Sequence, residues 1–282
     1  MSAKEKLVKF KNAICDYLGA FEKMMFPEYR CFLCGREVRD TDKCLCDDCL
    51  KEFKLISGNI CKRCGMPLPE LNKICDDCKN IEYEFDVARA AFLYNRKTAR
   101  LITDLKFRNR KYLARFLAIC MSETLKTFPM DVDYIIPVPV SAQRLKSRGF
   151  NQAELIANHL SLLIGKPVVN DLIIRTNKET ANQKDLSKLD RMKNLVGAFE
   201  VMRTKEFEGK DLLIVDDVFT TGATVNEVAR MLRKLNPSGV CVITAGKTDY
   251  KSIAERRESA LRKKHAHANS VIFGKEKRKK LR

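Results

Sequence analysis

The stretch of sequence that decides the fold runs from Ile214 to Val225 and reads IVDDVFTTGATV. An apolar run is followed by two adjacent carboxylates and then by a Thr, Thr, Gly, Ala, Thr turn that leads into a helical pattern. Carboxylates accept hydrogen bonds from ribose hydroxyls, while hydroxyls and free amides at a helix start bind phosphate. The stretch therefore predicts a cradle for a ribose 5-phosphate, at the strand-to-helix junction where open α/β sheets bind ligands.

A purely structural explanation of the same residues is also open. The run from Leu212 to Val215 could be an ordinary buried strand, Asp217 a turn residue, and Thr220 or Thr221 an N-cap. Two acids in succession at the carboxyl end of an apolar strand favour the ligand site.

The residues on either side predict a parallel sheet. A strand at 211–217, a helix at 223–235 and a strand at 239–245 make a βαβ unit with a right-handed crossover. The pattern upstream indicates a strand at 87–94, helices at 97–106, 111–127 and 152–164, a strand from 133 that stops near Pro137, and a strand at 171–175. The cradle then lies at the carboxyl edge of the sheet.

A basic loop is predicted between Pro137 and the helix at 152–164. It contains Arg144, Lys146 and Arg148, and a basic loop after a parallel strand suits a diphosphate. We take Arg144 and Arg148 as candidate diphosphate ligands. A solvated basic turn is the alternative.

The polar segment from Thr176 to Gly197 lacks clean periodicity, and its length suggests a flap that closes over phosphates. Its candidate ligands are Gln183, Arg191 and Asn194. The alternative is a disordered surface loop.

Eight of the 12 cysteines form four Cys-x2-Cys pairs, which are Cys31 with Cys34, Cys46 with Cys49, Cys61 with Cys64, and Cys75 with Cys78. Two such knuckles supply four thiolates for one tetrahedral zinc ion, so four knuckles predict two structural zinc sites. The segments are also copies of each other, since CFLCG and CDDC answer CKRCG and CDDC. Gly35 and Gly65 follow the first knuckles, where a left-handed backbone would turn amides towards sulfur.

Three questions about these cysteines stay open in the sequence. Buried apolar thiols or a redox pair are the alternative to zinc. Adjacent and interleaved knuckles satisfy the stoichiometry equally well. Cys44 lies two residues before Cys46 and could replace it as a ligand.

Composition sets further bounds on the 282 residues. Without a run of about 18 apolar residues, no membrane span is expected, and the lysines near the start argue against a signal peptide, so we expect a cytoplasmic protein. Apolar residues at helical spacing predict an amphipathic helix at 3–25. The net charge of +18 favours polyanionic partners, and residues 247–282 carry half of it, with 13 basic and four acidic side chains. A tail that merely aids solubility is the alternative for this segment.

The opening stretch resembles the phosphoribosyl pyrophosphate (PRPP) loop of type I phosphoribosyltransferases. The resemblance implies that Asp216 and Asp217 are the catalytic acids that hold the ribose hydroxyls, with Mg²⁺ on the diphosphate. It also implies that a loop binds the 5-phosphate, formed by Val218, Thr220, Thr221, Gly222, Ala223 and Thr224.

The order of parts resembles the ComF family of competence proteins. The resemblance rests on the ribbon cysteines, the PRPP loop, LKF at 105–107, PVPV at 137–140, RGFNQ at 148–152, and the spaced Gln183, Leu186, Ser187, Arg191, Asn194 and Phe199. It implies an α/β fold in which a type I phosphoribosyltransferase-like parallel-sheet domain follows a small double zinc ribbon and an N-terminal helix. The expected divisions are an N-terminal helix at 1–27, the ribbon at 28–80, the phosphoribosyltransferase-like domain at 84–248 and a basic tail at 249–282.

Membership of this family implies handling of incoming single-stranded DNA in natural transformation, beside the proteins of the DNA uptake machinery. One hypothesis is therefore a competence protein whose cradle binds PRPP or another phosphate ligand. The other is an active Mg²⁺-dependent phosphoribosyltransferase acting on a nucleobase or related amine, because both acids are present.

Overall fold

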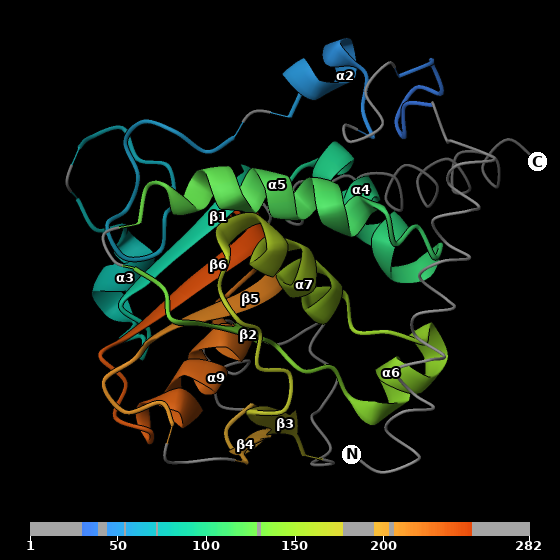
Figure 1. The fold of residues 1–282 in the computed structure, drawn as a ribbon. Coiled ribbons are helices and arrows are strands. Elements are labelled where there is room, and N and C mark those ends of the chain that lie inside the picture. The colour runs from blue at the N-terminus through green and yellow to red at the C-terminus, as the bar shows by residue number, and fades with distance from the viewer. Residues whose placement is uncertain are drawn as a thin grey trace, which may run out of the picture. The chain divides into compact units, whose positions relative to one another are not determined.

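The structure is a computed structural model that describes residues 30–38, 44–53, 55–71, 73–128, 131–176, 195–202 and 206–249 (Figure 1). The predicted N-terminal helix, nearly all of the basic tail, and the flap residues Gln183, Arg191 and Asn194 lie outside these ranges. The chain divides into two compact units, residues 1–54 and 55–282, and the second half of the cysteine repeat falls in the larger unit with the sheet.

The central sheet has four parallel strands in the order β1-β6-β5-β2. Its strands are β1 (Val87–Leu93), β2 (Tyr134–Pro137), β5 (Asp211–Phe219) and β6 (Gly239–Lys247). Every residue of β6 is buried, because it lies between two strands with helices on both faces. Together, β5, α9 (Ala223–Arg233) and β6 confirm the predicted βαβ unit.

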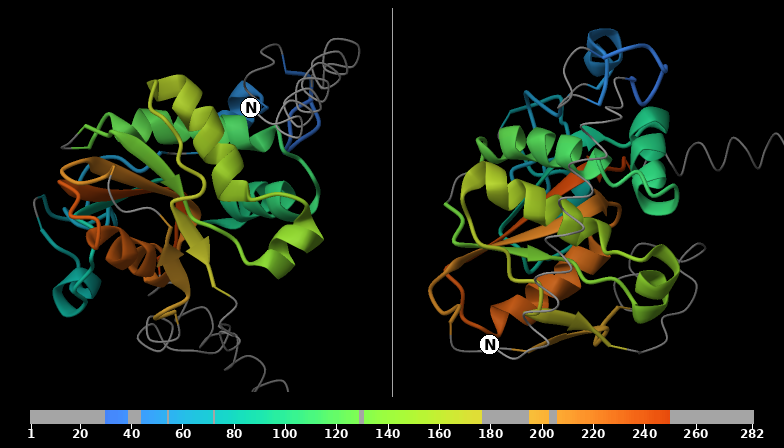
Figure 2. Two further views of the ribbon diagram at one scale, coloured as in Figure 1. Left: turned by 60° about the horizontal axis from the view of Figure 1, so that its bottom comes forward. Right: turned by 45° about the vertical axis from the view of Figure 1, so that its right-hand side comes forward.

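Helices cover both faces of the sheet (Figures 1 and 2). One face carries α5 (Leu113–Leu125) and α7 (Gln152–Ile164), and the other carries α9. The α4 helix (Arg96–Phe107) begins at Asn95, whose side chain accepts from the amides of Lys97 and Thr98. The α7 helix begins at Asn151, which accepts from the amide of Ala153 and donates to the carbonyl of Val138. This second bond ties the start of α7 to the end of β2.

The segment after β2 was predicted to be a basic loop, and this prediction is wrong. Most of the segment is a helix, α6 (Ala142–Arg148). The Oγ of Ser141 accepts from the amide of Arg144 at 3.3 Å, which caps the first turn. Gly149 has a φ of 80° and closes the last turn in the left-handed conformation. The sequence contains signals for this helix, since an N-cap serine and a C-cap glycine flank residues with good helix propensity. The basic charge of the segment was given more weight than these signals.

Two short strands, β3 (Ile173–Arg175) and β4 (Phe199–Val201), pair antiparallel in a separate sheet. The strand predicted at 171–175 is therefore present over its last three residues. None of the helices in the described ranges has the length and apolar character needed to span a bilayer.

The smaller unit contains α2 (Asp47–Lys51), and the larger contains the corresponding helix α3 (Asp76–Asn80). Both helices begin directly after a cysteine, and both are preceded by a knuckle whose ends form an isolated antiparallel bridge, Arg30 with Glu37 and Ile60 with Pro67. The internal repeat in the sequence is thus a repeat in structure.

Candidate functional site

The two acids lie inside β5 rather than in a turn. Asp216 is 9% exposed and Asp217 is 4% exposed, and the strand continues through Val218 and Phe219 before the chain turns. The backbone amide of Asp217 donates to Oδ1 of Asp216 at 2.8 Å. The explanation of Asp217 as a turn residue is therefore wrong.

Asp217 is held by side chains from two other elements. Lys106, near the end of α4, forms an ion pair with Oδ2 of Asp217. Gln152, the first residue of α7, donates from Nε2 to Oδ1 of Asp217 at 3.2 Å. Arg148 at the end of α6 in turn donates to Oε1 of Gln152. Two helices thus contact one carboxylate at the carboxyl edge of the sheet, and a third supports it through Gln152.

These contacts push the pKa values of the two acids apart. Burial, followed by the charge of Asp217, raises the pKa of Asp216 well above its ordinary value. Burial also acts to raise the pKa of Asp217, but the positive charge of Lys106 and the hydrogen bonds from Asp216, Lys106 and Gln152 outweigh it and leave that pKa lowered. The surroundings therefore favour the charged form of Asp217 over that of Asp216.

The loop after β5 requires glycine at one position. Gly222 has a φ of 80°, and a Cβ there would lie 2.6 Å from Cζ of Phe219. Thr221 is 2% exposed, and its Oγ1 accepts from the amide of Ala223 at 3.3 Å, so this hydroxyl holds the turn. Thr220 is exposed and Thr224 is half-buried. The first turn of α9 follows directly, and the amides of a first turn point out of the helix.

Of the two predicted diphosphate ligands, the structure brings one close to the acids. Arg148 is connected to Asp217 by Gln152, which hydrogen-bonds both residues. The pKa of Arg148 is lowered, and burial is the largest cause. Arg144 lies on the exposed side of α6, where its charge acts to lower the pKa values of Arg148 and Arg175.

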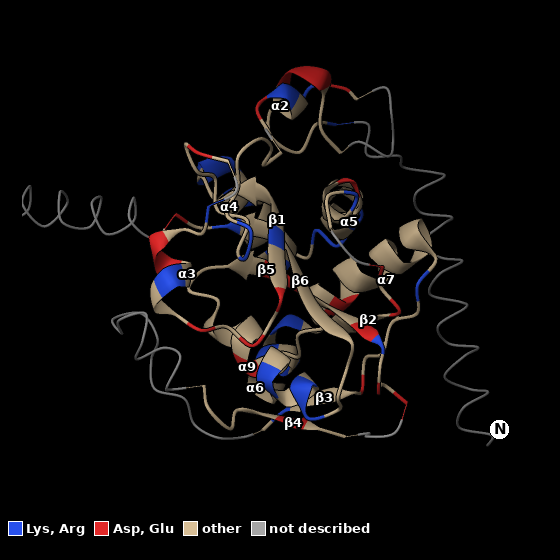
Figure 3. Cartoon of the chain, turned by 90° about the vertical axis from the view of Figure 1, so that its left-hand side faces the viewer, with Lys and Arg blue, Asp and Glu red and all other residues tan. Residues whose placement is uncertain are grey.

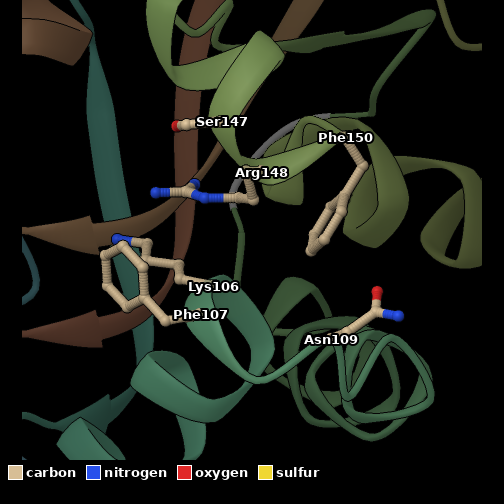
Figure 4. A pocket seen from close by; sticks show the side chains of 6 residues that line it. All are labelled: Lys106, Phe107, Asn109, Ser147, Arg148 and Phe150. Atoms are coloured by element: carbon tan, nitrogen blue, oxygen red, sulfur yellow. The ribbon is translucent and has the colours of Figure 1, made fainter.

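A cavity of about 280 Å³ lies next to the acid pair (Figure 4). Figure 4 shows side chains from the end of α4 facing side chains from the end of α6. The lining residues are Lys106, Phe107, Asn109, Ser147, Arg148 and Phe150. The guanidinium of Arg148 lies 5.1 Å from the ring centroid of Phe107, which is 71% exposed. Because Lys106 contacts Asp217 and also lines the cavity, the acids and the cavity belong to one site.

The eight predicted metal ligands form two clusters. Cys31, Cys34, Cys46 and Cys49 make one, and Cys61, Cys64, Cys75 and Cys78 make the other. The sulfur atoms of each cluster lie within 4.8 Å of one another, which fits tetrahedral zinc. Each cluster is formed by two knuckles that follow one another in the sequence, so the pairing is adjacent and not interleaved. Cys44 belongs to neither cluster.

Local geometry around the sulfur atoms also suits thiolates. Gly35 and Gly65 have φ values of 75° and 68°, which confirms the predicted left-handed conformation at both positions. The amide of Cys75 donates to the sulfur of Cys61 at 3.3 Å, and Nε of Arg36 donates to the sulfur of Cys34 at 3.4 Å. Four thiolates per cluster complete the coordination shell, so these sites are structural.

Three residues of this site, Lys106, Gln152 and Phe107, had no role assigned to them from the sequence. Lys106 and Phe107 belong to LKF, and Gln152 ends RGFNQ, so the signal was present as short motifs. The motifs do not indicate which residues these side chains contact, because Gln152 and its partner Asp217 are 65 residues apart in the chain.

Comparison with known proteins identifies the family to which this architecture belongs. The family model described as a double zinc ribbon domain matches residues 21–79, and the model described as a phosphoribosyl transferase domain matches residues 145–266. The chain is thus one of the proteins in which a double zinc ribbon precedes a phosphoribosyltransferase fold. Within that class, it belongs to the ComF family of competence proteins.

Several relatives match over most of their own length. Competence protein F of Haemophilus influenzae is 34% identical over 218 residues, which are 75% of this chain and 94% of that protein. Competence protein ComFC of Bacillus subtilis is 29% identical, over 68% of this chain and 78% of its own. DNA utilization protein YhgH of Escherichia coli K12 is 29% identical, over 75% and 94%.

Among solved structures, the adenine phosphoribosyltransferase of Thermoanaerobacter pseudethanolicus covers 52% of this chain and 84% of its own. It has 16% identity and a TM-score of 0.31.

Proposed function

We propose that this protein handles single-stranded DNA in natural transformation, on the cytoplasmic side of the uptake machinery, and that its cradle binds PRPP or a related phosphate together with Mg²⁺. The names of its relatives, which are competence and DNA utilization proteins, support the role in competence. The contacts around Asp217 support the ligand.

The observation that carries the ligand proposal is the set of contacts that Lys106 and Gln152 make with the carboxylate of Asp217, next to Asp216. A carboxylate held in place by Lys106 and Gln152 is a preorganised acceptor for a ribose hydroxyl. The left-handed turn at Gly222 and the first turn of α9 follow within six residues and suit the 5-phosphate. Mg²⁺ prefers oxygen ligands and is usually held by substrate phosphates with one or two carboxylates, so the acid pair fits a Mg²⁺–diphosphate ligand.

The DNA proposal rests on basic and aromatic side chains around the cavity. The end of α4 and the turn after it carry Lys106, Arg108, Arg110 and Lys111, and Figure 3 shows basic residues there and on α6. Buried Asp104 pairs with Arg108 and Arg110, which leaves an excess of positive charge. Cations that follow a phosphate backbone, beside an exposed ring such as Phe107 on which a base can stack, are typical of single-strand binding.

The test of the ligand proposal is calorimetric titration of PRPP with and without Mg²⁺. We expect Mg²⁺-dependent binding that Asp217→Asn weakens by about tenfold to a hundredfold, since a hydrogen bond to a charged group contributes about 1.5–3 kcal/mol. Glu208→Gln removes an exposed acid and is the matched control. Equal affinities of the Asp217 and Glu208 variants would rule out the cradle as the binding site.

A second function is favoured by the cavity. Its position beside the acids, and its two phenylalanines, suit the planar acceptor base of a phosphoribosyltransferase. For an enzyme, we expect Mg²⁺-dependent release of diphosphate from PRPP in the presence of a nucleobase, abolished by Asp216→Asn with Asp217→Asn. If PRPP binds and no base supports diphosphate release, the transferase function is excluded and the binding function stands.

A further inference from the structure

The second cysteine cluster and the phosphate loop share one hydrophobic core. Buried Cys61, Cys64 and Cys78 belong to the same set of packed residues as Phe219 and Ala223, which flank the loop. The larger unit therefore contains a metal site whose surroundings reach the candidate ligand site. Two side chains make the connection.

Tyr83 is the first connection. Its hydroxyl donates to the backbone carbonyl of Thr221 at 3.1 Å, and the residue is 4% exposed. On the other side, the guanidinium of Arg63, which lies in the knuckle between Cys61 and Cys64, donates to the carbonyl of Tyr83. One residue thus contacts both the knuckle and the middle of the loop.

Lys247 is the second connection. It is 3% exposed, and its Nζ lies 3.6 Å from the ring centroid of Phe219. It is also close enough to Cys64 and Cys78 for their charge to act against the lowering of its pKa by burial. The ring of Phe219 leaves no room for a Cβ at Gly222, so Phe219 packs directly against the turn.

The knuckle is itself attached to the edge of the sheet. The amide of Ala88 in β1 donates to the carbonyl of Arg63 at 2.6 Å. A Cβ on Gly65 would lie 2.9 Å from the carbonyl oxygen of Ala88, so the backbones of knuckle and strand are in close contact. A shift of the second cysteine cluster would therefore also displace the backbone of β1 at Ala88.

We propose that the second cysteine cluster positions the phosphate loop, with Tyr83 and Lys247 as the positioning residues, so that metal occupancy there and ligand affinity at the loop are linked. The inference rests on the proposed function of the loop. Linkage is reciprocal, so a bound phosphate ligand also strengthens metal retention at this cluster. The two halves of the cysteine repeat then have different roles.

The first experiment uses Tyr83→Phe, which keeps the ring and removes the hydroxyl. We expect two zinc ions per chain to remain, amide hydrogen exchange at residues 220–224 to quicken, and PRPP affinity with Mg²⁺ to fall about fivefold, the effect of one neutral hydrogen bond. Tyr134→Phe is the control, because Tyr134 lies half-buried at the start of β2, at the amino edge of the sheet and away from the loop. Unchanged exchange in the Tyr83 variant would overturn the proposal.

The second experiment compares Cys64→Ser with Cys34→Ser, a change in the other cluster and the other unit. Each variant should retain less zinc, and we expect faster exchange at residues 220–224 in Cys64→Ser alone. Equal changes in both variants would mean a general loss of stability and would contradict the linkage. Because Cys64→Ser can fail to fold, Lys247→Met, which keeps the apolar stem, is measured by the same exchange experiment and is expected to quicken it.

Exchange is measured without ligand, which separates two kinds of failure. If the wild-type protein does not bind PRPP, the proposed function fails, while the exchange comparison still decides whether the cluster orders the loop.

Discussion

The side-chain amide of Gln152 donates to Oδ1 of Asp217 at 3.2 Å and so joins the first residue of α7 to the acid pair in β5. Arg148 holds Gln152 from the end of α6, and Lys106 holds the other oxygen of Asp217 from α4. The motifs LKF, RGFNQ and DD therefore meet at one carboxylate. This convergence explains why the pKa of Asp217 is lowered while burial and the charge of Asp217 raise that of Asp216.

The ion pair between Lys106 and Asp217 is expected to contribute strongly to stability. Its side chains are 22% and 6% exposed, and removal of one partner from a buried pair costs about 3–5 kcal/mol. We predict that Lys106→Met lowers the free energy of unfolding in urea by about 2–4 kcal/mol at pH 8, because Lys106 is not fully buried. Lys126→Met, at an exposed pair with Glu123, should change it by less than about 1 kcal/mol.

The pH dependence of this effect follows from the pKa of Asp217. In the wild-type protein that pKa is lowered, so the stabilisation is present above the ordinary carboxyl pKa and is lost as the pH falls through the lowered value. Without Lys106, burial raises the pKa of Asp217, and stability falls as the pH rises. The deficit of Lys106→Met should therefore grow between pH 5 and pH 8. A deficit that is the same at both pH values would contradict this origin.

Asp216 is expected to reduce the stability of the ligand-free protein. Its pKa is raised in the folded state, so between the ordinary carboxyl pKa and the raised value the unfolded chain has lost a proton that the folded chain keeps. Stability therefore falls as the pH rises through this window. We predict that Asp216→Asn, which does not titrate, is more stable than wild type at pH 8, and that the difference shrinks towards pH 4.

Thermal unfolding at both pH values measures this difference. The same variant should bind PRPP more weakly, because the amide cannot replace a carboxylate in the ligand complex. A variant that is less stable than wild type at pH 8 would show that Asp216 has a structural role.

The sequence is sufficient for the βαβ unit and for the cysteine clusters, because both depend on local pattern. Periodicity locates β5 and β6, and the duplicated knuckles identify all eight metal ligands. The α6 helix was not predicted, because the segment was interpreted from its basic charge and not from the capping residues at its two ends. The partners of Asp217 were not predicted for a different reason: ion pairs between distant elements depend on the packing of the helices, which no local pattern records.

Binding of single-stranded DNA is expected to depend on Phe107 and on the basic tail. Removal of a stacking ring costs about 1–3 kcal/mol per base, so Phe107→Ala should weaken binding by about tenfold. Leu162→Ala on α7 is the control, because Leu162 is also an exposed apolar residue. Fluorescence anisotropy with a labelled oligonucleotide measures both, and equal affinities would exclude stacking on Phe107.

Removal of residues 250–282 is the electrostatic counterpart of this variant. The truncation begins after Lys247, since that residue is buried in β6. The segment carries 12 basic and three acidic residues, and each lost phosphate contact lowers the slope of log affinity against log salt by about 0.7. We predict weaker binding and a shallower slope; an unchanged slope would mean that the tail does not contact DNA.

The adjacent pairing of knuckles gives a separate prediction for zinc content. Cys44 lies outside both clusters, whereas Cys46 belongs to the first, so Cys44→Ser should keep two zinc ions per chain and Cys46→Ser should lose one. Four thiolates are needed to complete a structural site, and three leave a position open to water and chelators. Metal analysis after dialysis against a weak chelator distinguishes the variants. Loss of zinc from Cys44→Ser would show that Cys44 is the ligand in place of Cys46, and a wild-type value near one would show a single site shared by the two halves of the repeat.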